Sequence, residues 1–298
     1  MRHPSILALA GLGATALAFA VAIYVAGSYA LMRAHVEPRR WRVVLREALR
    51  ELGWALLTQP LLPLFYVFGR RLARGRGVPI VAVHGYMQNR VDFLRIARAC
   101  ERAGLGPVYG FNYPWYESIP ACARRLARFV EDVCRETGES QVDVVAHSVG
   151  GLVAMEYVHQ DGACPHPGSG ARVRRVVTIA SPHAGVSWRG PIVGAVGPEV
   201  RVGCAFLVER AERAVRVPCL SVYSTHDNVV HPAHTSALAT RGGTDWSVAH
   251  VGHLAILFDP DAVRATVSFL AAPALSAQGE GLAQSAVSLE PDRELVRA

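Results

Sequence analysis

The hydrophobic pattern begins with a long uncharged run at the N-terminus. Residues 5–32 are 28 positions without Asp, Glu, Lys or Arg. A helix needs about 20 apolar residues to cross the hydrocarbon core of a bilayer, so the run predicts a transmembrane anchor over residues 1–32. The alternative is a secretory signal, because Arg2 supplies a positive start and Ser28-Tyr29-Ala30 has small residues suited to cleavage. The apolar part of such a signal has only about 7 to 15 residues, which favours the uncleaved anchor.

A mixed pattern follows over residues 33–77. Residues 52–69 form another uncharged run, which Pro60 and Pro63 interrupt as a helix. The whole segment 33–77 is predicted to be a basic amphipathic element that lies at the membrane interface, and the alternative is a cap packed on the following domain. Apolar residues at helical spacing, with arginines on the other face, begin the segment: Val43, Val44, Leu45, Ala48, Leu49 and Leu52.

From residue 78 onward, short apolar strands alternate with helical patterns. This alternation is typical of an α/β fold in which a mostly parallel sheet carries helices on both faces, and we predict one such domain over residues 78–272. The tail, residues 273–298, is rich in small and polar residues and is predicted to be flexible. The predicted strands are 80–83, 106–113, 142–146, 173–180, 218–224 and 246–251, and the predicted helices are 91–103, 119–138, 150–159, 205–215, 232–239 and 261–271.

Positive charge is concentrated beside the predicted anchor. Ten arginines and three glutamates lie in residues 33–76, and this segment carries the whole formal net charge of +7. A basic segment next to a spanning helix suits anionic lipid headgroups and predicts that this side faces the cytoplasm. If the N-terminus is a cleaved signal, the domain is instead periplasmic or secreted. Without a nucleic-acid-binding motif, the basic segment does not predict a nucleic acid partner.

The stretch VDVVAHSVGGLVAMEYV, residues 142–158, places Ser148 between a predicted strand and a predicted helix. A serine nucleophile at such a sharp turn needs small residues two positions before and two after it, and Ala146 and Gly150 meet that need. The common form has glycine at the first of these positions, so this is a variant. The alternative is a serine that caps the helix.

Two further residues complete a candidate triad in the chain order serine, acid, histidine. Asp227 follows the strand 218–224, and His253 follows the strand 246–251. Asp227 would hold the His253 tautomer, and His253 would take the proton of Ser148. Asp245 and Asp259 are alternative acids, but they are expected to begin a strand and a helix; His250 is the alternative base.

The oxyanion formed by attack of Ser148 needs hydrogen-bond donors already in place. One predicted donor is the N–H of Val149, which follows the nucleophile. The other is the N–H of Tyr86, in the loop after the strand 80–83, with Met87 as the alternative. His84 is expected to hold this loop in place.

Four motifs, VAVHGY, AHSVGG, SVYSTHDNVV and HVGHLAIL, occur in this order. Together they resemble the α/β-hydrolase superfamily and are most similar to small lidless bacterial triacylglycerol lipases and related membrane-bound esterases. The resemblance covers about residues 78–271. It implies ester hydrolysis without a cofactor, with Ser148, Asp227 and His253 as the triad and Tyr86 and Val149 as the oxyanion donors.

Residues 181–217 leave little room for a lid domain. Aromatic residues after the second strand, with His183, are the candidate substrate-binding residues, and a metal site is not expected. We therefore predict a membrane-anchored serine hydrolase of carboxylic esters, with lipid esters as the favoured substrates and membrane lipids as partners. An acyltransferase or thioesterase, and less favourably a non-catalytic scaffold, are the alternatives; the oligomeric state is not predicted. The candidate rim residues are Trp115, Tyr116, His183 and Trp188.

Overall fold

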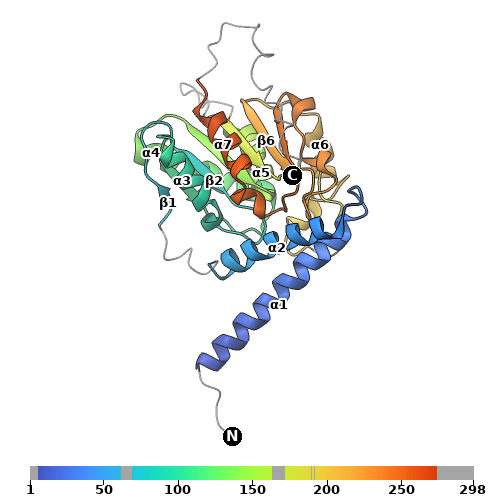
Figure 1. The fold of residues 1–298 in the computed structure, drawn as a ribbon. Coiled ribbons are helices and arrows are strands. Elements are labelled where there is room, and N and C mark those ends of the chain that lie inside the picture. The colour runs from blue at the N-terminus through green and yellow to red at the C-terminus, as the bar shows by residue number, and fades with distance from the viewer. Residues whose placement is uncertain (1–5, 62–68, 163–171, 189, 191, 274–298) are drawn as a thin grey trace, which may run out of the picture.

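The centre of the fold is a seven-stranded sheet with the order β1-β3-β2-β4-β5-β6-β7 (Figure 1). This computed structural model describes residues 6–61, 69–162, 172–188, 190 and 192–273. All neighbouring strands are parallel except β1, which runs antiparallel to β3. The strands are β1 (Arg71–Ala73), β2 (Ile80–Val83), β3 (Val108–Phe111), β4 (Val142–His147), β5 (Val173–Ile179), β6 (Cys219–Ser224) and β7 (Thr244–Val248).

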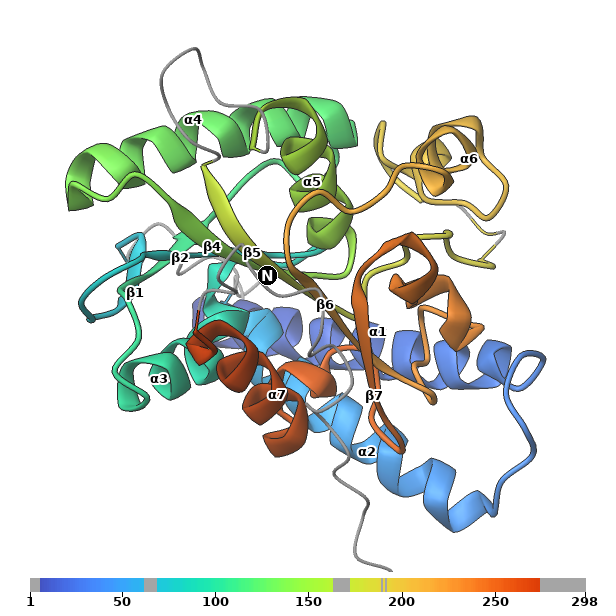
Figure 2. The same ribbon diagram turned by 90° about the horizontal axis from the view of Figure 1, so that it is seen from above.

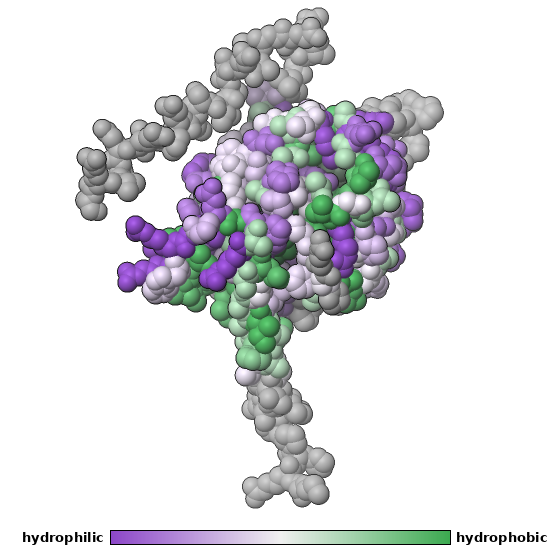
Figure 3. All heavy atoms as spheres, turned by 90° about the vertical axis from the view of Figure 1, so that its right-hand side faces the viewer, coloured by the Kyte–Doolittle hydropathy of each residue, from purple (hydrophilic) through white to green (hydrophobic). Residues whose placement is uncertain are grey.

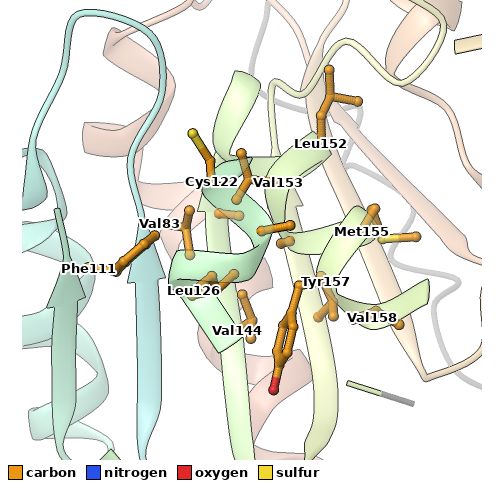
Figure 4. Packing of buried hydrophobic residues seen from close by; sticks show 14 of the residues in the cluster. Val83, Phe111, Cys122, Leu126, Val144, Leu152, Val153, Met155, Tyr157 and Val158 are labelled. Carbon is orange, nitrogen blue, oxygen red and sulfur yellow. The ribbon is translucent and has the colours of Figure 1, made fainter. Parts of the chain in front are cut away.

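Helices cover both faces of this sheet, as Figure 2 shows. One face packs against α4 and α5, and the other packs against α3 and α7. All six residues of β4 are buried, as expected for a central parallel strand covered on both sides. Figure 4 shows the core between α4, α5 and the strands. The helices of the domain are α3 (Leu94–Arg102), α4 (Ile119–Thr137), α5 (Val149–Tyr157), α6 (Ala205–Ala211) and α7 (Pro260–Ala271).

The predicted α/β fold with a mostly parallel sheet is confirmed, but two local elements differ. The segment 232–239 was predicted as a helix, and that prediction is wrong: the structure has short 3-10 turns at Ala233–Ser236 and Ala239–Arg241. Two of its backbone N–H groups bond to another segment instead, because the Asp245 carboxylate accepts those of Leu238 and Ala239. The strand β1 was not predicted, and it extends the sheet to residues before 78.

The first helix, α1 (Ile6–Met32), projects from the body of the domain (Figures 1 and 3). Among the described residues, its segment Thr15–Met32 is long and apolar enough to cross a membrane, a test that a signal sequence also passes. The last two turns pack on the rest of the protein through four buried side chains at a spacing of three or four residues: Val25, Ser28, Tyr29 and Met32.

The second helix, α2 (Trp41–Thr58), packs against the domain along one face. The buried residues on this face, three or four positions apart, are Glu47, Glu51, Ala55 and Thr58. Trp54 stacks on Phe258 with 3.9 Å between ring centroids. The helix therefore docks as a cap would, while large apolar side chains remain exposed elsewhere on it: Trp41, Leu45, Leu49, Leu56 and Leu57. Two parts of the predicted segments lie outside the described residues. They are residues 62–68 of the interfacial segment and residues 274–298 of the tail.

Candidate active site

Ser148 lies at the turn between β4 and α5 in a strained conformation. Its φ of 53° is in the left-handed region. Holding a residue that has a side chain in this conformation costs roughly 1–3 kcal/mol of folding free energy. The turn is held because the Ser148 N–H donates to the Ile179 carbonyl at 2.8 Å. The Oγ atom, instead of capping α5, lies 2.9 Å from His253 Nε2.

Close packing explains the small residue two positions after Ser148. A Cβ atom on Gly150 would lie 2.4 Å from the carbonyl oxygens of both Val83 and His84. Any side chain there would push α5 away from β2 and widen the turn. The glycine thus lets the backbone that carries Ser148 approach the loop after β2.

His253 and Asp227 complete a hydrogen-bonded chain. His253 Nδ1 lies 2.9 Å from Asp227 Oδ2, and all three side chains of the chain are buried. The second carboxylate oxygen of Asp227 accepts the N–H groups of Val229 and Val230, each at 2.8 Å. Asp227 therefore both stabilises the turn that follows it and pairs with the histidine, because the turn holds the other carboxylate oxygen toward the imidazole.

The electrostatic surroundings favour a charged His253. Burial lowers the pKa of His253, but the charge of Asp227, its hydrogen bond and the charge of Glu51 outweigh burial and leave the pKa raised above 6.5. Ser148 is thus hydrogen-bonded to an imidazole that is itself hydrogen-bonded to a carboxylate. This arrangement activates a serine as a nucleophile.

The alternative acids and base have other partners. Asp245 lies in β7 and binds backbone N–H groups, and Asp259 caps the first turn of α7. His250 Nδ1 lies 2.8 Å from Glu47 Oε1, and its ring stacks on His226.

The loop after β2 packs directly against Ser148. A Cβ atom on Gly85 would lie 2.8 Å from Ser148 Cβ. His84 holds the loop, because the Tyr113 N–H donates to its Nε2 at 3.3 Å and its Nδ1 donates to the Gly85 carbonyl at 2.9 Å. Burial lowers the pKa of His84 to about 4, so the ring is neutral near pH 7.

Both predicted oxyanion donors therefore belong to segments beside the serine. Val149 is the first residue of α5, and the first N–H groups of a helix have no acceptor within it. Tyr86 follows Gly85 in the packed loop.

The predicted rim residues divide into two groups. The Trp115 ring packs edge-on against Tyr86 with 4.8 Å between centroids, and Tyr116 beside it is exposed. Trp188 is also partly exposed. His183, by contrast, is buried with Nε2 3.0 Å from Thr178 Oγ1, and burial lowers its pKa to about 3.

Sequence reasoning missed several groups that contact the histidine loop. Asn228 accepts the N–H of His253 at 2.8 Å, and Glu51 of α2 accepts those of Leu254 and Ala255, also at 2.8 Å. His147 Nε2 donates to the His253 carbonyl at 3.0 Å. Asn228 and His147 adjoin predicted site residues, but no local pattern marks Glu51. Over residues 6–61, 69–162, 172–188, 190 and 192–273, no group of three His, Cys, Asp or Glu is arranged to hold a metal ion.

Comparison with known proteins agrees with the fold described above. The model of a family described by the alpha/beta hydrolase fold matches residues 78–197. No curated protein matches the sequence. Together with the order of the strands, this match supports an α/β-hydrolase fold for the chain.

Three solved lipase structures are similar to this chain. Aspergillus fumigatus lipase B has a TM-score of 0.55 and 18% identity, covering 66% of this chain and 53% of that one. The mature lipase BlEst2 of Bacillus licheniformis has a TM-score of 0.54 and 15% identity, covering 66% and 96%. The monoacylglycerol lipase of Paleococcus ferrophilus has a TM-score of 0.51 and 17% identity, covering 67% and 96%. The match thus spans about half of the Aspergillus enzyme and nearly all of the other two, and at these identities it shows the fold.

Proposed function

We propose that this protein is a membrane-anchored serine hydrolase that cleaves carboxylic esters, with lipid acyl esters as the preferred substrates. The observation that carries the proposal is the hydrogen-bonded chain from Ser148 through His253 to Asp227, with the serine on a positive-φ turn. Lipases among the structurally similar proteins support the ester class.

The reaction follows from this geometry. His253 Nε2 takes the proton of Ser148 as Oγ attacks the ester carbonyl carbon, and Asp227 stabilises the imidazolium that forms. The N–H groups of Val149 and Tyr86 donate to the oxyanion. His253 then gives the proton to the leaving alcohol oxygen, and the acyl group stays on Ser148. Water, deprotonated by His253, attacks this ester, releases the carboxylic acid and restores the serine.

The N-terminal helix supports a substrate drawn from the bilayer. Residues 6–24 precede Val25, the first buried side chain described in α1, and extend about 28 Å at the helical rise, close to the thickness of a bilayer core. Val21 among them packs on the hydrophobic clusters of the protein. The next turn reaches the site, because Asn228 Nδ2 donates to Ser28 Oγ at 2.7 Å. Cleavage after Ala30 would remove this contact, which favours an anchor over a signal.

Exposed side chains beside α1 fit a membrane surface. Apolar residues of α2 are exposed together with cations, which suits the boundary between headgroups and acyl chains. We place the domain on the cytoplasmic side because these cations follow the spanning segment directly. The exposed arginines of this region are Arg33, Arg40, Arg42 and Arg46.

The direct test is hydrolysis of p-nitrophenyl esters of increasing acyl length by the detergent-solubilised full chain. Ser148→Ala is expected to lower kcat at least about 10³-fold. Ser247→Ala, at an exposed serine of β7, is the matched control and should keep the wild-type rate. A wild-type preference for long acyl chains supports a lipase, whereas wild-type turnover no faster than that of Ser148→Ala contradicts the proposal.

A further inference from the structure

The backbone that carries His253 is held by a carboxylate from α2. Glu51 is 2% exposed, and its two oxygens accept the N–H groups of Leu254 and Ala255, each at 2.8 Å. On the other side of the histidine, a Cβ atom on Gly252 would lie 2.5 Å from Glu51 Oε2. The carboxylate therefore packs against the main chain both before and after His253.

A second contact to this loop comes from α1. Asn228 Oδ1 accepts the His253 N–H at 2.8 Å, while Asn228 Nδ2 donates to Ser28 Oγ at 2.7 Å. Ser28 in turn donates to the Val25 carbonyl at 2.9 Å. The three successive N–H groups of residues 253–255 are thus bound by two side chains. Glu51 belongs to α2, and Asn228 is hydrogen-bonded to α1. Both helices precede the residues that match the family model.

The docking of α2 is fixed by contacts on either side of Glu51. Arg50 donates to Asp259 at 3.0 Å, and Trp54 stacks on Phe258. One turn earlier, the buried carboxylate of Glu47 binds Arg39 and His250. Glu51 is therefore set in a rigid interface, which is what precise positioning of a neighbouring loop requires.

Charge gives Glu51 a second effect on the same imidazole. The ionisable groups that face His253 are Asp227, Glu51, His147 and His231. Burial and the charge of Asp227 raise the pKa of Glu51 above its usual value, and the two backbone hydrogen bonds and the charge of His253 only partly offset this rise. An ionised Glu51 favours the imidazolium, the form that His253 takes when Ser148 loses its proton.

We propose that Glu51 is a positioning residue for the hydrolase reaction, so that α1 and α2 complete the active site as well as joining it to the membrane. It fixes the main chain of His253 against Ser148 and stabilises the charged imidazole. This inference rests on the proposed function.

The test compares two isosteric variants of the full chain in detergent, Glu51→Gln and its matched control Glu47→Gln. A glutamine at 51 keeps one acceptor but turns an NH2 group toward the second backbone N–H. Deuterium exchange of the peptide that contains residues 252–257 is measured by mass spectrometry, together with kcat, KM and the pH profile.

In Glu51→Gln we expect faster exchange in this peptide and a kcat lower by about 10²-fold, as for a misplacement of about 1 Å. KM should change by less than about 2-fold, because the substrate is not touched, and the acidic limb of the pH profile should move to lower pH. Glu47→Gln should keep the exchange, kcat and pH profile of the wild type, even where its melting temperature falls.

Wild-type exchange and kcat in Glu51→Gln overturn the proposal. If that variant does not fold, Glu51→Asp serves instead, because it keeps the charge and shortens the reach. We then expect lower kcat with an acidic limb close to that of the wild type; unchanged kcat and exchange contradict positioning. Absence of ester hydrolysis by the wild type refutes the proposed function separately, and the exchange measurement still decides whether Glu51 holds the loop.

Discussion

His253 Nδ1 lies 2.9 Å from Asp227 Oδ2, although 26 residues separate the two in the chain. The turn that follows Asp227 occupies its other oxygen, so the carboxylate has one orientation toward the imidazole. This pairing keeps the proton on Nδ1 and leaves Nε2 free to accept the serine proton.

Asp227→Asn is expected to lower kcat by about 10³ to 10⁴-fold while the protein stays folded. The amide oxygen would keep the turn, and the NH2 group would face Nδ1 and impose the wrong imidazole tautomer. The control is Asp245→Asn, the rival acid from the sequence, which binds N–H groups of residues 238 and 239. Comparable losses in both variants, or a loss below tenfold in Asp227→Asn, would show that Asp227 does not orient the histidine.

The pH dependence of kcat/KM should have an acidic limb with its midpoint above 6.5. Asp227 and Glu51 outweigh the effect of burial and raise the pKa of His253, and the protonated ring does not accept a proton from Ser148. Activity is therefore lost as pH falls through this raised pKa and regained above it. Initial rates at low substrate concentration between pH 5 and pH 9 check this, and a midpoint at or below 6.5 contradicts it.

Gly150→Ala should destabilise the protein by about 1–3 kcal/mol and remove most activity, because the new methyl group meets two backbone carbonyl oxygens. The matched variant is Ala146→Gly, which restores the common form of the motif and introduces no clash. Thermal melts and ester hydrolysis of both variants test the turn. A stable, active Gly150→Ala protein would mean that the tight approach of α5 to β2 is not needed.

Membranes washed with alkaline carbonate should retain the protein, and its intact mass should include residues 1–30 or lack only Met1. Retention in the membrane follows from the apolar length of α1. The intact N-terminus is expected because Ser28 of this helix binds Asn228 of the domain. Ala30→Leu, which removes a small residue needed for signal cleavage, should leave the processing unchanged. A soluble product beginning at Leu31 would instead identify a secretory signal.

Local signals account for the parts of the fold and site that the sequence predicted. Alternating strands and helices from residue 78 onward give the parallel sheet, since buried strands such as β4 are apolar throughout apart from Asp143 and His147. Ser148, Asp227 and His253 each follow a strand, and the carboxyl ends of parallel strands meet at one edge of the sheet. Their convergence is therefore a consequence of topology.

Contacts between distant segments account for what was missed. Glu51 lies in an amphipathic, arginine-rich helix, where a glutamate looks like one more surface charge, yet it binds residues more than 200 positions away. The short strand β1 has one buried residue, Ala73, and no periodic signal. Residues 232–239 have helical spacing, but Asp245 takes backbone N–H groups that a helix would use.

Labelling by a fluorophosphonate tests the central claim most directly, because this probe forms a covalent bond with an activated serine. The full chain is incubated with the probe and the modified residue is found by mass spectrometry of its peptides, beside Ser148→Ala and Ser247→Ala. The account predicts one adduct, on Ser148, that persists in Ser247→Ala and is absent in Ser148→Ala. An adduct on another serine would contradict a nucleophilic role for Ser148. The absence of any adduct on the folded wild-type protein would contradict it too.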